Sequence, residues 1–228
     1  MTRAIIIVAG GSGSRMGADI PKQFITLAGK PVLLHTVRLF ASFRNMKIVL
    51  VLPEAHFETW NKICQDYDFN YPVSLVPGGK TRYESVKNGL DAVQDADFIG
   101  VHDGVRPLVS RETIIRCFED AATFGSAIPV LPSVDSVRIL DDNASDSHVM
   151  NRNRVLLVQT PQVFRRDAIW SAYNLFDFHD ATDDASVVQS AGYNIHLCQG
   201  NRENIKLTTP TDLVIAEAFI KAYPNLLA

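Results

Sequence analysis

Short runs of β-branched and other apolar residues alternate with longer amphipathic stretches along most of this sequence. Such runs, bounded by Gly, Pro or Asp, are typical of parallel strands buried on both faces. They occupy Ile5–Val8, Ile48–Leu52, Val73–Val76, Phe98–Val101, Ala127–Leu131 and Val155–Val158. The amphipathic stretches between them predict helices over Pro31–Phe43, Ala55–Tyr67, Thr81–Val93 and Arg111–Phe124. Alternation at these lengths predicts right-handed βαβ units, and therefore an open sheet with helices on both faces.

One segment departs from this alternation. Ser133 to Asn153 is polar and extended, with the turn-prone Asp141-Asp142-Asn143 in its middle, which predicts a β-hairpin. An isolated two-stranded hairpin is marginally stable in water, so we expect it to pack on something, and a second subunit is the natural candidate.

The remaining signals complete the expected architecture. Thr209 is a good N-cap and Pro210 suits the first helical position, so a helix is expected to run on through Leu213–Ala222. A length of 228 residues favours one domain. We expect an α/β fold whose single domain spans 1–228: a Rossmann-like, open, mostly parallel sheet with a protruding β-hairpin arm at about 133–154.

Composition limits the class of protein. Lys and Arg total 22 and Asp and Glu 25, a near-balance that excludes a strongly basic nucleic-acid binder. The cysteines Cys64, Cys117 and Cys198 have no metal-binding spacing, so each is expected to be a buried or half-buried apolar residue. The apolar run near the N-terminus is too short for a signal peptide or a membrane span. We expect a soluble, cytoplasmic protein without a membrane or nucleic-acid partner.

The first expected strand leads into a glycine-rich turn, Ala9-Gly10-Gly11-Ser12-Gly13. Such a turn beyond the carboxyl end of a strand lets backbone N–H groups approach phosphates. It is not a dinucleotide-binding fingerprint, because Met16 stands in place of the third glycine and no acidic residue ends a second strand. Arg15 and Lys22 add two cations and favour a polyphosphate site. The alternative is a tight turn followed by solvated basic residues.

Two further loops follow expected strands. Pro77-Gly78-Gly79-Lys80-Thr81 lacks the first glycine of a P-loop, and we expect a smaller contact with the same ligand, aided by Arg82 and Ser85, or else an ordinary loop. In His102-Asp103-Gly104-Val105-Arg106-Pro107, the carboxylate of Asp103 is placed to hold Mg²⁺ against phosphates. The less favoured alternatives for Asp103 are a helix N-cap or a buried salt bridge to Arg106. His102 is expected to be structural.

Later motifs add polar groups but no catalytic base. Thr182 is expected to be a helix N-cap followed by two acids, a role that is compatible with lining a pocket. Lys206 is expected to point either to solvent or into a site. Signatures of serine hydrolases, zinc proteases and cysteine nucleophiles are absent from the sequence. A site rich in phosphate-binding groups and poor in bases suits a nucleophile that arrives already ionised.

These motifs together resemble a known family. The glycine-rich turn with Pro21-Lys22-Gln23 looks like the signature of sugar-phosphate nucleotidylyltransferases. The full ordered set resembles the 2-C-methyl-D-erythritol 4-phosphate cytidylyltransferase family of the non-mevalonate isoprenoid pathway. Its other members here are Gly78-Gly79-x-x-Arg82-x-x-Ser85, His102-Asp103-Gly104-x-Arg106-Pro107, Thr160-Pro161-Gln162, Thr182-Asp183-Asp184-Ala185-Ser186 and Asn204-Ile205-Lys206-x-Thr208.

The resemblance implies transfer of CMP from CTP to 2-C-methyl-D-erythritol 4-phosphate by a homodimer whose arm embraces the partner. It implies catalytic roles for Arg15, Lys22, Arg152 and Lys206, and Mg²⁺ bound by Asp103. The implied CTP-binding residues are Ala9, Gly10, Gly11, Gly13, Gly79, Arg82, Ser85, Asp103 and Gly104. The implied sugar-phosphate residues are Arg106, Ser136, Thr160 and Thr182, some of them reaching across the dimer.

Two positions depart from the family pattern. Asn151 stands where an aspartate commonly precedes the arginine, and Lys80 stands where a small or acidic residue is common. Two other functions stay open at this point. The related ribitol 5-phosphate cytidylyltransferases share the glycine-rich turn and the HDxxRP stretch, and a non-catalytic nucleotide sensor would need only that turn and Asp103. Lys22, Arg152 and Lys206 together favour an enzyme.

Overall fold

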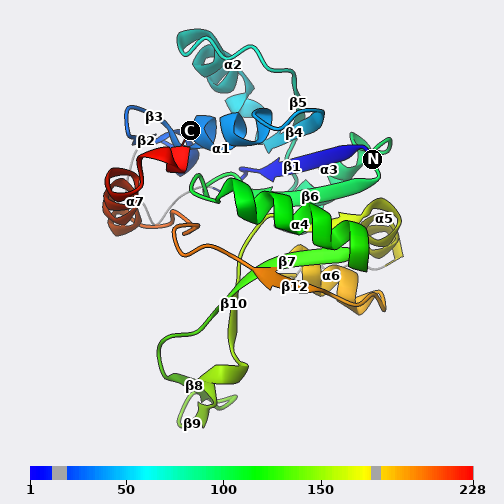
Figure 1. The fold of residues 1–228 in the computed structure, drawn as a ribbon, viewed down its shortest axis with the longest axis vertical. Helices are drawn as coiled ribbons and strands as arrows, with labels where there is room; N and C mark the ends of the chain where they lie inside the picture. The colour runs from blue at the N-terminus through cyan, green and yellow to red at the C-terminus, as the bar shows by residue number, and fades with distance from the viewer. Residues whose placement is uncertain (12–19, 176–180, 228) are drawn as a thin grey trace.

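The computed structural model of the chain describes residues 1–11, 20–175 and 181–227. Its centre is an open sheet with the strand order β10-β7-β11-β6-β1-β4-β5, and β12 pairs with β7 beside this path. Helices lie on both faces of the sheet, and a hairpin extends away from it (Figure 1). The expected α/β class and the protruding hairpin are confirmed.

One half of the sheet is parallel, as the apolar runs predicted. The strand β1 (Arg3–Val8) pairs in parallel with β4 (Met46–Leu52) on one side and with β6 (Phe98–Asp103) on the other. The half-buried β5 (Val73–Pro77) continues the parallel order at the edge. The carboxyl ends of these strands therefore lie along one edge of the sheet.

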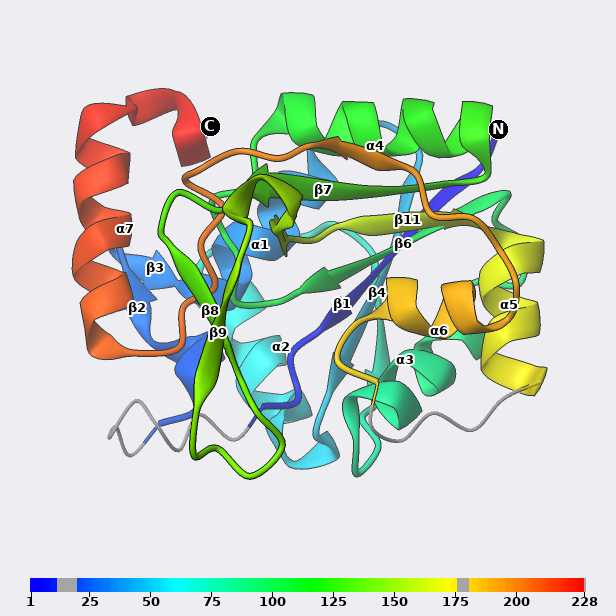
Figure 2. The ribbon, with the colours of Figure 1, turned by 90° about the horizontal axis from the view of Figure 1, so that it is seen from below.

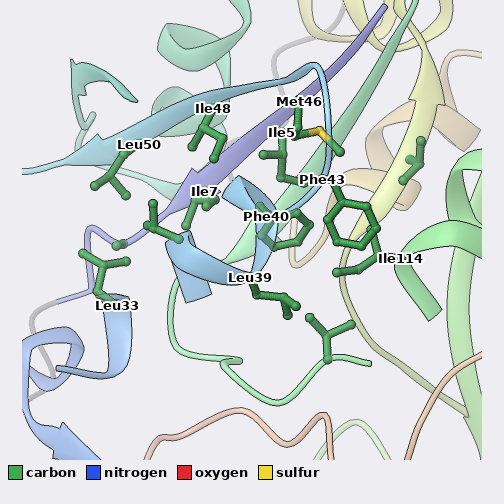
Figure 3. Close-up of a cluster of buried hydrophobic side chains, with 14 of the residues drawn as sticks. Ile5, Ile7, Leu33, Leu39, Phe40, Phe43, Met46, Ile48, Leu50 and Ile114 are labelled. Carbon is green, nitrogen blue, oxygen red and sulfur yellow. The ribbon is translucent and has the colours of Figure 1, made fainter. Parts of the chain in front are cut away.

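Successive residues of β1 enter two different cores, because side chains of a strand alternate between its faces. Ile5 and Ile7 pack in one buried cluster and Ala4 and Ile6 in another. Figure 3 shows Ile5 and Ile7 facing Leu33, Phe40 and Ile114 in the first cluster.

Each cluster is closed by its own helices (Figure 2). The first is covered by α1 (Val32–Ala41), α2 (Phe57–Asp66) and α4 (Arg111–Phe124). The second is covered by α3 (Arg82–Asp91), α5 (Arg166–Leu175) and α6 (Asp184–Ser190). Four of these helices match the expected amphipathic stretches. The helix start expected at Thr182 corresponds to α6, whereas α5 was not predicted.

The other half of the sheet is mixed, which corrects the expectation for Val155–Val158. The strand β11 (Gln162–Arg165) runs antiparallel between β6 and β7 (Ser126–Pro132). The strand β10 (Leu156–Val158) is antiparallel to β7 and largely exposed, with Leu157 at 54%. The expectation of a buried parallel strand at Val155–Val158 is wrong, because the chain returns from β7 through the hairpin and not through a crossover helix.

The hairpin itself has the expected form. In the part of the chain that the structure describes, the strands β8 (Val137–Leu140) and β9 (Ser147–Met150) pair only with each other. A short 3₁₀ turn, η4 (Arg152–Arg154), leads back to β10. Apolar side chains on it are exposed, with Leu140 at 65% and Val149 at 70%. We refer to residues 133–154 as the arm.

The chain ends on α7 (Pro210–Ala222) and η5 (Pro224–Leu227). Thr209 is the N-cap and Pro210 the first helical residue, as predicted. The carboxylate of Asp212 accepts hydrogen bonds from the backbone N–H groups of Thr208 and Thr209 at 2.8 and 2.7 Å. This helix covers a third buried cluster that includes Val105, Leu108 and Leu207.

Two short 3₁₀ turns and three short strands complete the fold. They are η2 (Lys22–Phe24), the paired β2 (Thr26–Leu27) and β3 (Lys30–Pro31), η3 (Glu54–His56), and β12 (Leu197–Gln199). Within the described ranges, no helix is both long and apolar enough to cross a membrane. Cys64 is half-buried and Cys117 and Cys198 are buried, all unbridged, as expected.

Candidate active site

Loops that follow three strands meet at the carboxyl edge of the sheet. The N–H of Ala9, which follows β1, donates to the carbonyl of Val51 in β4 at 2.9 Å. The N–H of Gly104, which follows β6, donates to the carbonyl of Val8 in β1 at 2.9 Å. A pocket of about 450 Å³ opens at this edge. Its lining consists of Val8, Ala9, Gly10, Gly11, Lys22, Gln23, Gly79, Lys80, Thr81, Arg82, Ser85, Asp103, Val105 and Lys206. We call it the nucleotide pocket, because most of the described residues that are expected to bind CTP line it.

The charges around the nucleotide pocket favour an anion. Among the described residues, four cationic side chains line it, from Lys22, Lys80, Arg82 and Lys206, against the single carboxylate of Asp103. The whole chain carries a net charge of −3, so this excess of positive charge is local. Glycine-lined backbone beside clustered cations is a phosphate-binding arrangement.

Lys22 reaches the nucleotide pocket from η2, which a buried glutamine ties to β1. The Nε2 of Gln23 donates to the carbonyl of Ala9 at 3.0 Å. A methyl group added at Gly11 would lie 3.7 Å from the Nζ of Lys22, so the ammonium lies over the glycine-rich turn. The structure thus brings Lys22 to the described part of that turn, as predicted, whereas Gly13 and Arg15 lie outside the described residues.

The loop before α3 is held by its own helix. The hydroxyl of Ser85 accepts a hydrogen bond from the N–H of Gly79 at 3.0 Å and donates one to the carbonyl of Thr81 at 2.9 Å. Glu84 accepts from the N–H of Lys80 at 2.6 Å. A methyl group at Gly79 would lie only 2.2 Å from the Cβ of Glu84, so this turn requires glycine. Ser85 therefore shapes the pocket wall that it lines.

Asp103 is buried among cations at the end of β6. Its Oδ2 lies 3.0 Å from the Nε of Arg106 and 3.1 Å from the Nζ of Lys206. Burial alone would raise the pKa of this carboxyl, but Lys206 and Arg106 outweigh it and hold the pKa well below the usual range. The salt bridge to Arg106, the less favoured sequence interpretation, is thus present, and Asp103 still lines the nucleotide pocket.

His102 is structural, as expected. Its Nε2 lies 3.1 Å from the carbonyl of Arg106, which can only accept, so this nitrogen carries the proton. The hydroxyl of Thr160 lies 2.9 Å from Nδ1 and can donate to it, while accepting from the N–H of Asp103 at 3.1 Å. Complete burial lowers the pKa of His102 to about 4, so the ring is neutral at pH 7.

A second pocket of about 290 Å³ adjoins the first. It shares Arg82, Asp103 and Lys206 with the nucleotide pocket. The rest of its lining is Arg106, Val158, Gln159, Thr160, Gln162, Thr182 and Asp183. We call it the acceptor pocket, and it unites three of the residues expected to bind the sugar phosphate: Arg106, Thr160 and Thr182.

Thr182 is not the helix N-cap that the sequence suggested. Asp183 is the N-cap of α6, and its Oδ1 accepts from the N–H of Ser186 at 3.0 Å. A carboxylate is a stronger acceptor at a helix N-terminus than a hydroxyl, and it displaces threonine by one position. Thr182 is exposed and lines the acceptor pocket.

Three predicted site residues lie apart from both pockets within one chain. Ser136 and Arg152 are exposed on the arm, where the Nη1 of Arg152 donates to the carbonyl of Val134 at 2.8 Å. Asn151 caps the 3₁₀ turn that carries Arg152, accepting from the N–H of Asn153 at 3.0 Å. Gly104 packs behind the nucleotide pocket, where an added methyl group would lie 2.8 Å from the Cβ of Ala9.

The polar residues of the site that were missed from the sequence include Gln159 and Asp184. Gln159 lines the acceptor pocket, and its Nε2 donates to the carbonyl of Asn201 at 2.9 Å. Asp184 binds Arg82 through both carboxylate oxygens, at 2.9 and 2.6 Å. No feature of the sequence around Gln159 indicated a role in the site. Asp184 is the second acid of the Thr182–Ser186 motif, and the sequence assigned it only a place in the first turn of a helix.

Metal-binding capacity in the site is small. The described residues include no cluster of three or more His, Cys, Asp or Glu side chains that could hold an ion. Both ion pairs of Asp103 use Oδ2, which leaves Oδ1 as the oxygen able to face a cation. Mg²⁺ commonly takes one or two protein carboxylates and completes its shell with substrate phosphates and water. Asp103 suits an ion of that kind, shared with a bound triphosphate.

Known proteins resemble this chain over almost its whole length. Residues 3–222 match the family described as "IspD: 2-C-methyl-D-erythritol 4-phosphate cytidylyltransferase". The enzyme of that name from Phocaeicola vulgatus is 51% identical over 222 residues, covering 96% of this chain and all of the relative. The crystal structure of 4-diphosphocytidyl-2C-methyl-D-erythritol synthase from Anaerococcus prevotii aligns with a TM-score of 0.83 at 28% identity, covering 96% of each chain. The crystal structure of the Thermus thermophilus 2-C-methyl-D-erythritol 4-phosphate cytidylyltransferase aligns with a TM-score of 0.79 at 31% identity. This alignment covers 97% of this chain and all of the Thermus thermophilus chain. The chain belongs to the IspD family of 2-C-methyl-D-erythritol 4-phosphate cytidylyltransferases.

Proposed function

We propose that this chain transfers CMP from CTP to 2-C-methyl-D-erythritol 4-phosphate, giving 4-diphosphocytidyl-2-C-methyl-D-erythritol and pyrophosphate. Membership of the IspD family supports the reaction. The observation that carries it is the pair of adjoining pockets that share Arg82, Asp103 and Lys206. Two phosphorylated molecules bound there would meet at a common wall that carries two cations.

The reaction needs no general base. A phosphate monoester has a second pKa of about 6, so the acceptor is mostly a dianion at neutral pH. One of its phosphate oxygens attacks the α-phosphorus of CTP, a new P–O bond forms, and the bond to the bridging oxygen breaks as pyrophosphate leaves. No proton moves in this step. The obstacle is the charge of two anions, and catalysis therefore rests on positioning and charge neutralisation.

Different side chains position the two substrates and neutralise their charge in each pocket. Lys22 lies over the glycine-rich turn and faces the triphosphate, with Arg15 as the second expected cation there. Gly79 and Ser85 shape the wall against the cytidine. Lys206, held 3.1 Å from Asp103, reaches the shared wall and neutralises the reacting phosphates. Arg106, Thr160 and Thr182 receive the sugar phosphate in the acceptor pocket.

Asp103 would hold Mg²⁺ together with the phosphates of CTP, since it is the carboxylate that lines the nucleotide pocket. Bound there, Mg²⁺ would supply positive charge to the triphosphate and to the pyrophosphate leaving group. The low pKa of Asp103 keeps the carboxylate ionised for this role at every physiological pH.

The arm supports a homodimer. Within one chain, Ser136 and Arg152 lie on the arm and outside both pockets. A groove of about 1080 Å³ beside the acceptor pocket exposes apolar side chains of β10 and of the base of the arm, among them Val134 and Leu157. A second copy that covers this groove would bring its own Ser136 and Arg152 towards the sugar phosphate.

The oligomeric state tests this arrangement. Light scattering at micromolar concentration should give a molar mass of about twice the 25.2 kDa of the chain. Leu157→Asp, which places a charge on the apolar groove, should shift the protein towards the monomer and lower activity, while Val214→Asp on the exposed face of α7 serves as the control. A fully active monomer would contradict both the dimer and a site shared between subunits.

Substrate selection tests the proposed reaction. Pyrophosphate release with CTP and 2-C-methyl-D-erythritol 4-phosphate should exceed release with UTP or ATP, or with ribitol 5-phosphate as acceptor, by at least about tenfold in kcat/KM. Equal turnover with UTP or ATP would overturn the choice of nucleotide. Faster turnover of ribitol 5-phosphate would assign the related reaction, and CTP binding without turnover would indicate a sensor.

A further inference from the structure

The guanidinium of Arg82 lies in the wall between the two pockets, and a buried carboxylate holds it there. Arg82 is the first residue of α3 and lines both the nucleotide pocket and the acceptor pocket. Its Nη1 and Nη2 donate to the two oxygens of Asp184 at 2.9 and 2.6 Å. This two-pronged geometry fixes the plane of the guanidinium as well as its position.

Asp184 is fully buried and has a second donor. The hydroxyl of Tyr173, on α5, donates to Oδ1 of Asp184 at 2.6 Å. Tyr173 is in turn held by Tyr83, whose hydroxyl donates to the Tyr173 carbonyl at 2.8 Å and whose ring stacks on that of Tyr173 at 4.8 Å. The carboxylate is therefore fixed by residues of α3 and α5 at once.

The same segment of chain supplies the acceptor pocket. Thr182 and Asp183, which line that pocket, immediately precede Asp184. Gln162 of β11 holds the residues on both sides of Asp184, because its Nε2 donates to Asp183 at 2.9 Å and its Oε1 accepts from the N–H of Ala185 at 2.8 Å. A single rigid turn thus carries both a wall of the acceptor pocket and the anchor of Arg82.

The contact with Asp184 does not use all of Arg82. Each terminal nitrogen donates one hydrogen bond to Asp184, so within the described ranges the Nε–H and a second N–H on each terminal nitrogen remain for a ligand. The side chain is 23% exposed, whereas Asp184 is at 0%. Burial opposes the charge, but the Asp184 carboxylate outweighs it and raises the pKa of Arg82, so the guanidinium stays charged.

We propose that Asp184 is a positioning residue of this enzyme: with Tyr173 it holds Arg82 at the junction of the two pockets, where the guanidinium binds the phosphate groups of nucleotide and acceptor as they meet. The proposal rests on the assignment of the two pockets given above. It gives the second acid of the Thr182-Asp183-Asp184 sequence a function and links the acceptor wall to the cation of the nucleotide site.

A double-mutant cycle separates positioning from a general structural role. Asp184→Asn retains the shape of the side chain but loses its charge and puts an N–H₂ group against the guanidinium. We expect it to lower kcat/KM for CMP transfer between about tenfold and a hundredfold, because a displaced binding group costs this much. In an Arg82→Gln background the same change should cost less than about twofold, since Asp184 acts through Arg82.

The controls keep the cycle interpretable. Asp167→Asn removes the acid of the exposed pair between Arg165, at the end of β11, and Asp167, in the first turn of α5, and should leave kcat/KM unchanged. Thermal unfolding of every variant shows which are folded at the assay temperature. If Asp184→Asn does not fold, Tyr173→Phe removes one hydrogen bond from Asp184, and the same cycle with Arg82→Gln should show a loss of about threefold that disappears in the double variant.

Two results would overturn the proposal. One is a folded Asp184→Asn variant whose kcat/KM lies within about twofold of the wild type. The other is an equal loss from Asp184→Asn in the wild-type and Arg82→Gln backgrounds, which would show a role independent of Arg82. Failure of the proposed reaction is distinguishable, because the wild-type protein would then release no pyrophosphate from CTP with 2-C-methyl-D-erythritol 4-phosphate.

Discussion

Lys206→Ala should lower kcat by on the order of 10²–10³ while leaving the fold intact, because removing one preorganised charge at a reacting centre typically costs this much. The ammonium of Lys206 lies at the wall that both pockets share, 3.1 Å from Asp103. Without it, Asp103 would add to the repulsion between the two phosphate groups. Lys22→Ala should lower kcat by about the same factor, because the ammonium of Lys22 neutralises charge on the triphosphate. Initial rates of pyrophosphate release at saturating CTP and acceptor measure both effects.

Lys221→Ala is the matched control, because Lys221 is exposed in the last turn of α7 and lines neither pocket. It should leave kcat unchanged. A kcat for Lys206→Ala within about threefold of the wild type would contradict the proposed charge neutralisation. The reaction without a base also requires that His102→Ala cost far less activity than Lys22→Ala, provided that the variant is folded. The reverse order would show that a proton must be removed.

Acid should destabilise the protein through His102. Its pKa is lowered to about 4 in the folded state from an unfolded value of about 6.5. The unfolded chain therefore binds a proton first as the pH falls, and the stability that the neutral ring contributes is complete above about pH 6.5 and declines towards pH 4. The loss from this residue should be about 2–3 kcal/mol of unfolding free energy between pH 7.5 and pH 4.5.

Urea unfolding at the two pH values measures this difference. The His102→Gln variant can still bond to Thr160 and to the Arg106 carbonyl, but it has no titrating ring, so its stability should depend on pH less by about that amount. His148→Gln is the control, because His148 is 61% exposed on the arm and should leave the pH dependence of the wild type in place. Equal pH dependence in wild type and His102→Gln would show that the buried ring does not control acid stability.

The parts of the fold that the sequence predicted are those with strong local signals. The helix α4 has its expected bounds, Arg111–Phe124, because Ser110 caps its first turn and Gly125, at φ +89°, ends it. The parallel strands around β1 were predicted because a strand buried on both faces must be apolar at every position. The arm was predicted for the opposite reason, since a polar extended segment with a turn in its middle has no core to join.

Local signals failed where neighbouring elements decide the outcome. The apolar residues Leu156–Val158 resemble a buried strand, yet β10 lies at an exposed edge, because burial depends on which helices cover the sheet. The antiparallel direction of β11 follows from its place between β6 and β7, which no property of Gln162–Arg165 specifies.

The same division holds for the candidate site. The motifs named most of the pocket lining, because a glycine-rich turn or a strand-end aspartate has a chemical character of its own wherever it lies. The sequence did not reveal that Asp103 binds Lys206, or that Arg82 binds Asp184 across 102 positions. Such pairs form when packing closes long loops of chain, and the strength of each ion pair depends on how far the surrounding fold excludes water. Residue types and their local order were therefore readable from the sequence, whereas the pairing of charges was decided by the tertiary structure.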